Sequence, residues 1–98
     1  MHFKVSISAQ AEKNLDAIVL YLETEWPIRV RKKFLHILGE KIDLLSRSPF
    51  LYEASSKKKS VRRCVVTKQV ALFYRVLENE IEIISIQDTR QDPNKLKL

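Results

Sequence analysis

The first residues of the chain alternate between hydrophobic and polar side chains, and the period then changes. In the segment HFKVSIS, Phe3, Val5 and Ile7 stand between polar neighbours, which is the two-residue period of a half-buried β-strand. Ser8 comes next, and its hydroxyl group suits the N-cap of a helix, with Glu12 well placed in the first turn. The pattern therefore predicts a short strand that leads directly into a helix.

Two segments with the apolar spacing of helices follow. From Ala9 onwards, apolar residues recur at spacings of three and four, which is typical of an amphipathic helix. We expect this helix to end near Trp26, because a residue that precedes proline is disfavoured in the α region. Pro27 suits the first position of a second helix. Because the connection is so short, we expect an antiparallel helical hairpin in which Leu22 and Phe34 are buried.

Three further segments, residues 61–67, 70–77 and 81–86, have the character of strands. Residues 68–69 are expected to form the first turn. Residues 78–80 are expected to form the second, with an asparagine that can adopt a left-handed conformation. Short connections favour antiparallel neighbours. The order β-α-α-β-β-β predicts an α+β fold, a single domain of residues 1–98, in which a helical hairpin covers one face of a small antiparallel sheet.

Composition narrows the classes of protein and of site. The net charge of +6 favours nucleic acid, an anionic membrane surface or an acidic protein as partner. No apolar run is long enough to span a bilayer, and no signal peptide is evident. The single cysteine, Cys64, cannot form an internal disulfide and is expected to lie buried in a strand. These features predict a cytoplasmic protein that has no membrane role.

Motifs for cofactors and metals are missing from the sequence. A single glycine, Gly39, cannot build a phosphate-binding loop. His2 and His36 belong to separate elements, and with one cysteine they do not make a metal-ligand cluster. No Ser-His-Asp or Cys-His arrangement is apparent either. We therefore expect neither a cofactor nor a metal.

The strongest chemical signal is the segment of residues 55–76, which contains seven basic residues and no acidic one. Its lysine run, which includes Lys57 and Lys59, is either a binding element or simply a solvated loop. Arg62 and Arg63 are adjacent strand residues, so their side chains should point to opposite faces. A guanidinium group binds phosphate or carboxylate with two hydrogen bonds. The alternative for this pair is an ion pair with helix acids such as Glu12 or Asp16.

Aromatic and basic residues also alternate on the next predicted strand. Phe73 and Arg75 share one face, whereas Tyr74 lies on the other. Such interleaving suits nucleic-acid contact, and the alternative is a core residue on one side with a solvated cation on the other. Arg90 follows the last strand between two aspartates, which are expected to cap a turn.

The chain resembles the RelE/ParE superfamily of type II toxin–antitoxin toxins over nearly its whole length. The resemblance rests on five pieces in order: SISAQAEKNLDAIVLYLETEW, LSRSPFLY, Arg62-Arg63, ALFYRV and IISIQDTRQDP. It implies a helical hairpin on a curved antiparallel sheet. It also implies an acidic antitoxin that wraps the toxin in a hetero-oligomer.

The superfamily has two branches with different targets. Members similar to RelE are ribosome-dependent mRNA endonucleases, and members similar to ParE poison DNA gyrase. The nuclease branch has an arginine in the motif Arg-Leu-Val-Tyr, where this chain has Ala71-Leu72-Phe73-Tyr74. It also carries a late Tyr or His-Tyr pair, which QDTRQDPNKLKL lacks. The resemblance therefore favours a gyrase poison, with a ribosome-dependent mRNA endonuclease as the alternative and a nucleic-acid-binding module without toxin activity as a further one.

The candidate residues follow from these two branches. The proposed surface for the target or the antitoxin comprises Lys57, Lys59, Arg62, Arg63, Arg75 and Arg90. If the chain is a nuclease, the candidate catalytic residues are Arg62, Arg90 and Tyr74. Tyrosine and lysine have ordinary pKa values of about 10 and about 10.4, which suit neither a general base nor a general acid at neutral pH. This chemistry favours a toxin that acts by binding.

Overall fold

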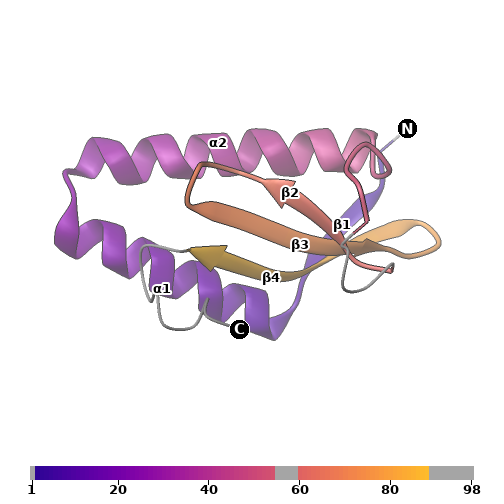
Figure 1. Cartoon of the computed structure of the whole chain (residues 1–98), viewed down its shortest axis with the longest axis horizontal. Helices are drawn as coiled ribbons and strands as arrows, with labels where there is room; N and C mark the ends of the chain where they lie inside the picture. Colours follow the sequence, from indigo (N-terminus) through magenta and orange to yellow (C-terminus); the bar gives the residue numbers. More distant parts are fainter. Residues whose placement is uncertain (1, 55–59, 89–98) are drawn as a thin grey trace.

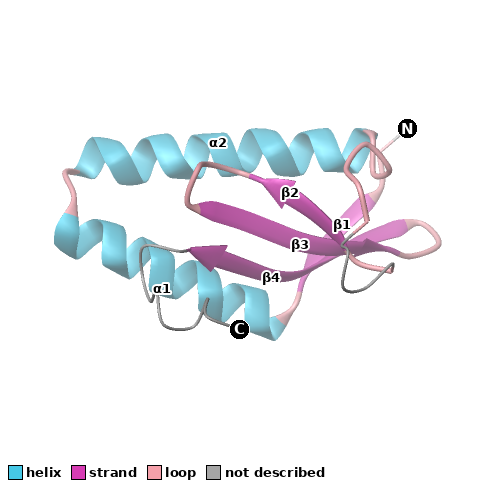
Figure 2. Ribbon diagram, in the orientation of Figure 1, coloured by secondary structure: helices cyan, strands magenta, loops and turns pink. Residues whose placement is uncertain are grey.

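The computed structural model describes residues 2–54 and 60–88. Within them the chain forms β1 (Lys4–Ile7), α1 (Ala9–Glu25), α2 (Ile28–Arg47), β2 (Arg62–Val65), β3 (Val70–Val76) and β4 (Glu80–Asp88), in the arrangement of Figures 1 and 2. The predicted order β-α-α-β-β-β is confirmed. Of the candidate site residues, Lys57, Lys59 and Arg90 lie outside the described part of the chain.

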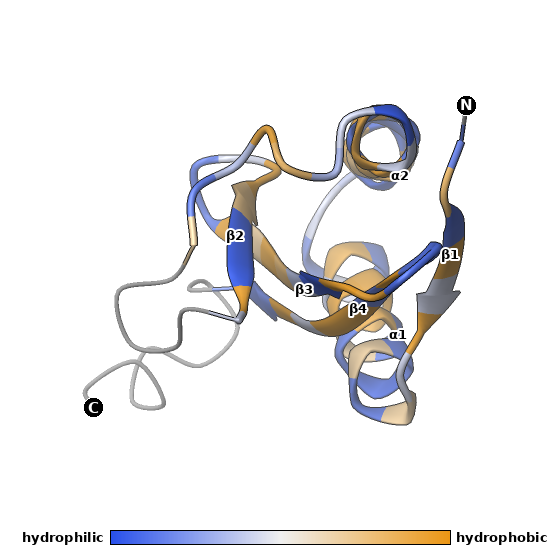
Figure 3. Cartoon of the chain, turned by 90° about the vertical axis from the view of Figure 1, so that its right-hand side faces the viewer, coloured by the Kyte–Doolittle hydropathy of each residue, from blue (hydrophilic) through white to orange (hydrophobic). Residues whose placement is uncertain are grey.

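The four strands form one sheet in the order β1-β4-β3-β2. Strands β2, β3 and β4 are antiparallel neighbours, as predicted, but β1 pairs with β4 in parallel. The sheet is therefore mixed rather than wholly antiparallel. Only the three consecutive strands are joined by short turns, whereas both helices separate β1 from them, so no local connection determines its direction. Seen from the side, the sheet is curved, with the edge strands β2 and β1 raised on either side of β3 and β4 (Figure 3).

Two details of the connections also differ from the sequence prediction. Pro27 flanks α2 as its N-cap with an extended backbone and is not the first helical residue. The turn between β3 and β4 is closed by a hydrogen bond from the Leu77 N–H group to the Glu80 carbonyl, at 2.7 Å. No residue in the described ranges has a positive φ, so Asn79 does not adopt the left-handed conformation that is open to an asparagine.

Ser8 makes two contacts where β1 leads into α1. Its hydroxyl oxygen accepts a hydrogen bond from the Ala11 N–H group at 3.0 Å, which confirms the predicted N-cap. The same hydroxyl group donates to the Ile84 carbonyl at 2.7 Å. Ile84 is the extra residue of a β-bulge, because Phe73 pairs with Ser85 and Tyr74 pairs with Ile83. Ser8 therefore stabilises the helix start and a backbone group that the sheet ladder leaves out.

Replacing Ser8 with alanine should remove both contacts. We expect Ser8→Ala to lower the free energy of unfolding by about 1–2 kcal/mol, because a capping bond and a bond to a strand carbonyl are lost together. Thr24→Ala is the matched control, since this exposed hydroxyl group bonds only carbonyls of its own helix, and its effect should stay within about 0.5 kcal/mol. Urea unfolding of both variants is the measurement. Equal effects would contradict the double role of Ser8.

Both helices cover the same face of the sheet. Alternate strand residues, among them Leu72 and Tyr74 of β3 and Ile83 of β4, form one buried cluster with the helical stripes. Leu22 and Phe34 belong to this cluster with 0% and 4% of their surface exposed, so the predicted hairpin and its buried face are confirmed. The opposite face of the sheet is therefore not covered by the helices.

Candidate functional site

The face of the sheet turned away from the helices is called the outer face. It comprises Lys4 and Ser6 of β1, Arg63 and Val65 of β2, Ala71, Phe73 and Arg75 of β3, and Glu80, Glu82, Ser85 and Gln87 of β4. Arg63 pairs in register with Phe73, and Phe73 pairs with Ser85. An arginine and an aromatic ring thus lie side by side at the middle of this face.

Arg62 and Arg63 point to opposite faces, as the alternation predicted. Arg62 lies on the helix side, at the rim, where its Nη1 group donates to the Tyr52 carbonyl at 2.6 Å. Its guanidinium group also lies 5.0 Å from the centre of the Phe50 ring, within the range of a cation–π interaction. These partners belong to the loop after α2, so the alternative of an ion pair with Glu12 or Asp16 does not describe Arg62.

Arg75 is paired within the sheet rather than open to a ligand. Its Nε group lies 2.6 Å from the Glu82 carboxylate on the neighbouring strand, and both side chains are partly exposed. Such a surface pair contributes little to stability, but it orients the guanidinium group and compensates its charge. Arg63 is in no ion pair with another residue of the described ranges. It is therefore an uncompensated cation of the described outer face, as is the exposed Lys4 of β1.

Tyr74 is a core residue. Its ring is fully buried, and its hydroxyl group donates to the Pro49 carbonyl at 2.8 Å. Burial raises the pKa of Tyr74 to about 12, because the phenolate form loses hydration, and the nearby charge of Arg62 opposes only part of this rise. Tyr74 is therefore neutral at physiological pH and holds a loop carbonyl. The catalytic role considered for it stays a prediction, and this burial does not favour it.

The loop after α2 is tied to the sheet at several points. Besides the contacts of Arg62 and Tyr74, Ala54 forms a β-bridge with Arg62, and the Arg63 N–H group donates to the Glu53 carbonyl at 3.4 Å. The sequence prediction missed these contacts because the loop has no periodic pattern. The structure thus shows Arg62 as a residue that holds this loop in place.

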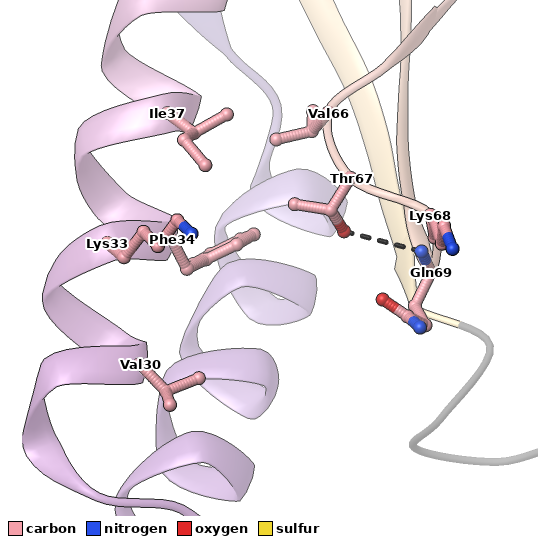
Figure 4. A pocket seen from close by; sticks show the side chains of 8 residues that line it. All are labelled: Val30, Lys33, Phe34, Ile37, Val66, Thr67, Lys68 and Gln69. Atoms are coloured by element: carbon pink, nitrogen blue, oxygen red, sulfur yellow. Dashed lines mark hydrogen bonds between the residues drawn. The ribbon is translucent and has the colours of Figure 1, made fainter.

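A groove between α2 and the turn from β2 to β3 was also missed. Its volume is about 350 Å³, and helix side chains face the turn across it (Figure 4). It is lined by Val30, Lys33, Phe34, Ile37, Val66, Thr67, Lys68 and Gln69. Thr67 stabilises the turn because its hydroxyl oxygen accepts hydrogen bonds from the Gln69 and Val70 N–H groups. The groove is therefore lined by apolar side chains together with two lysines.

In residues 2–54 and 60–88, no group of three or more His, Cys, Asp or Glu side chains could hold a metal ion. Cys64, buried as predicted, has its pKa raised because burial disfavours the thiolate. In the same ranges, no helix has the length and apolar character needed to cross a membrane.

A family model described as the ParE toxin of the type II toxin–antitoxin system parDE matches residues 5–93. The chain belongs to this toxin family. The predicted resemblance to the RelE/ParE superfamily is therefore confirmed. Membership in a toxin family favours the two toxin predictions over the alternative of a nucleic-acid-binding module without toxin activity.

Solved structures show the same fold for this ParE-family toxin. The chromosomal ParDE system from P. aeruginosa superposes with a TM-score of 0.75 at 19% identity, covering 89% of this chain and 96% of that one. A YoeB/ParE toxin from Agrobacterium tumefaciens gives 0.65 at 13% identity, covering 87% and 96%. The RelBE2 complex from Mycobacterium tuberculosis gives 0.62 at 14% identity, covering 90% and 99%. A comparison with curated protein sequences gave no match.

The toxin has a small residue on its outer face, near the start of β3. Ala71 stands where the resemblance places an arginine of the nuclease branch, and it pairs in register with Val65 and Gln87. Only 8% of Ala71 is exposed. This part of the outer face therefore has neither the charge nor the reach of a guanidinium group.

Proposed function

We propose that this toxin arrests growth by binding and poisoning DNA gyrase, and that it acts without cutting RNA. The observation that supports this proposal most strongly is the chemistry of strand β3. Arg75 is engaged by Glu82, Ala71 replaces an arginine, and Tyr74 is buried with a pKa of about 12. The remaining side chains of the outer face form a surface suited to binding a macromolecular target.

RNA cleavage would need more than positive charge. Attack by a ribose 2′-hydroxyl requires one group that accepts its proton and another that protonates the leaving oxygen. On the described outer face, the guanidinium group of Arg63 donates hydrogen bonds but accepts none, and Glu82 is held 2.6 Å from Arg75. Electrostatic stabilisation alone would remain available. This combination favours recognition of a macromolecular target over acid–base catalysis.

The partner that neutralises the toxin is proposed to be a cognate acidic antitoxin, in a toxin–antitoxin hetero-oligomer. The solved structures include complexes named as toxin–antitoxin pairs, ParDE and DinJ-YafQ among them. The groove offers apolar contacts from Val30, Ile37 and Val66 together with Lys33 and Lys68. An acidic segment that carries an apolar anchor would complement both features. We place this pair in the cytoplasm, where gyrase acts.

A direct assay separates the two possible targets. Purified toxin is expected to inhibit the supercoiling reaction of gyrase or to trap gyrase on DNA, and to leave ribosome-bound mRNA intact. In cells, growth arrest should be accompanied by a DNA-damage response and filamentation, and co-expressed antitoxin should relieve it. Transcripts cut within codons on the ribosome would assign the toxin to the nuclease alternative instead.

Arginine variants test the same proposal in a second way. A binding toxin should weaken in modest steps when Arg63, Arg75 or Arg90 is replaced by alanine, because contact energy is spread over several residues. A nuclease should lose orders of magnitude in rate from a single change such as Arg62→Ala or Arg90→Ala. Circular dichroism must accompany Arg62→Ala, since Arg62 also holds the loop after α2.

A further inference from the structure

The side of α2 that faces solvent carries large apolar side chains. Ile28 and Leu35 are 58% and 41% exposed, and they lie two helical turns apart on the same side. Gly39 lies one turn beyond Leu35, again on this side. We call Ile28, Lys32, Leu35, Gly39 and Asp43 the α2 stripe. It is directed away from the groove, because the groove-lining residues of α2 belong to the opposite side of the helix.

Gly39 is unusual for its place in the helix. It is the chain's single glycine and lies within the 20-residue helix α2, where glycine is less favourable than alanine. A Cβ atom at Gly39 would meet no atom within 4 Å. No contact among the described residues therefore explains why this position lacks a side chain. A second surface that approaches the helix backbone closely at this point would explain it.

The charges of the α2 stripe are arranged in two halves. Lys32 lies between Ile28 and Leu35, is exposed, and forms no ion pair with a residue of the described ranges. Asp43 lies one turn beyond Gly39 and contacts Arg47 at 2.9 Å on its outer flank. Leu35 and Gly39 thus lie between an exposed cation, Lys32, and a carboxylate, Asp43, which also contacts Arg47.

We propose that the α2 stripe is a homodimer contact, in which α2 packs antiparallel against α2 of a second copy of this chain. A two-fold axis midway between Leu35 and Gly39 also lies, within one residue, midway between Lys32 and Asp43. Leu35 of each copy then covers Gly39 of the other, and Lys32 of each copy meets Asp43 of the other. Both complementary contacts are made twice, as a two-fold interface requires.

This symmetry is the reason to favour a second copy over a different protein. A heterologous partner has no need for two complementary pairs that share one midpoint within a single helix. The contact is small beside the roughly 1,200–2,000 Å² buried in stable complexes. We therefore expect a reversible dimer with a dissociation constant in the micromolar range or weaker. The inference does not depend on the target of the toxin, and the groove remains accessible in such a dimer.

Sedimentation equilibrium of the full-length chain, from low micromolar into the hundreds of micromolar, tests the dimer. The wild type should show a monomer–dimer equilibrium, and Gly39→Gln should weaken it at least tenfold by filling the space that Leu35 occupies. The same substitution should raise the melting temperature of the monomer by a few degrees, because glutamine is the better helix former and nothing opposes it sterically. A weaker dimer together with a higher melting temperature of the monomer would show that a contact between copies is lost and that the fold is intact.

A charge exchange provides the second test. Lys32→Asp should weaken the dimer by placing two carboxylates together, and the double variant Lys32→Asp/Asp43→Lys should restore it. Lys13→Asp, on an exposed part of α1, is the matched control and should have no effect. A chain that stays monomeric throughout, a dimer indifferent to Gly39→Gln, or a double variant that fails to recover would each overturn the proposal. If the monomeric chain instead loses antitoxin or gyrase binding through Gly39→Gln, the stripe belongs to that partner.

Discussion

We expect Phe34→Ala to lower the free energy of unfolding by about 3–5 kcal/mol, which is the range for removing a buried phenylalanine ring. Phe34 is 4% exposed and joins the helical hairpin to the sheet within the main core cluster. A small domain has a total stability of about 5–15 kcal/mol. The substitution should therefore remove a large share of it and lower the melting temperature steeply.

The neighbouring residue provides the control for this prediction. Leu35 is 41% exposed and is outside the core cluster. At concentrations where the chain is monomeric, Leu35→Ala should change the free energy of unfolding by no more than about 0.5–1 kcal/mol. Urea unfolding of both variants at the same pH and protein concentration is the measurement. Similar losses for Phe34→Ala and Leu35→Ala would mean that α2 is rotated from the orientation described.

The helices could be predicted from the sequence because their signals are local. The three- and four-residue spacing of apolar positions identified the buried faces of both helices, and Leu22 and Phe34 are buried as expected. Ser8 could be recognised as an N-cap because capping depends on residues within one turn. Its second contact, with Ile84 of the distant strand β4, has no local signal.

The strand arrangement could be predicted only where turns are short. Hairpin spacing indicated that β2, β3 and β4 are antiparallel, whereas the parallel pairing of β1 with β4 joins residues more than seventy positions apart. Such a pairing depends on how the helical hairpin packs, which no pattern within β1 encodes. The turn at Asn79 shows a related limit, because a residue that tolerates a left-handed conformation is not compelled to adopt one.

The residues of the candidate site could be predicted from the sequence by their type, but the groups that they contact could not. Strand alternation separated Arg62 from Arg63, but it could not show that Arg62 binds the Tyr52 carbonyl of an aperiodic loop. It also could not show that Glu82 engages Arg75, since that contact depends on the register between β3 and β4. The groove was missed because it joins residues of α2 to a turn about thirty positions later.

Alkaline pH is expected to destabilise the toxin between about pH 10 and pH 12. Burial raises the pKa of Tyr74 to about 12 in the folded state, whereas an unfolded tyrosine loses its proton near pH 10. Above pH 10 the unfolded state therefore releases a proton that the folded state retains, and unfolding becomes easier. Below pH 10 the neutral Tyr74 hydroxyl group makes its full contribution to stability. Above pH 10 the free energy of unfolding should fall by about 1.4 kcal/mol per pH unit, which amounts to about 2–3 kcal/mol by pH 12.

Tyr74→Phe is the variant that isolates this effect. At neutral pH it should lower the free energy of unfolding by about 1–3 kcal/mol, because the buried Pro49 carbonyl loses its donor at 2.8 Å. Between pH 10 and pH 12 its stability should fall less steeply than that of the wild type. Burial raises the pKa values of Cys64 and Tyr52 in the same direction, so a shallower decline should persist in the variant. Denaturant unfolding at several pH values gives both slopes, and parallel slopes would show that the Tyr74 hydroxyl group is not held neutral by the core.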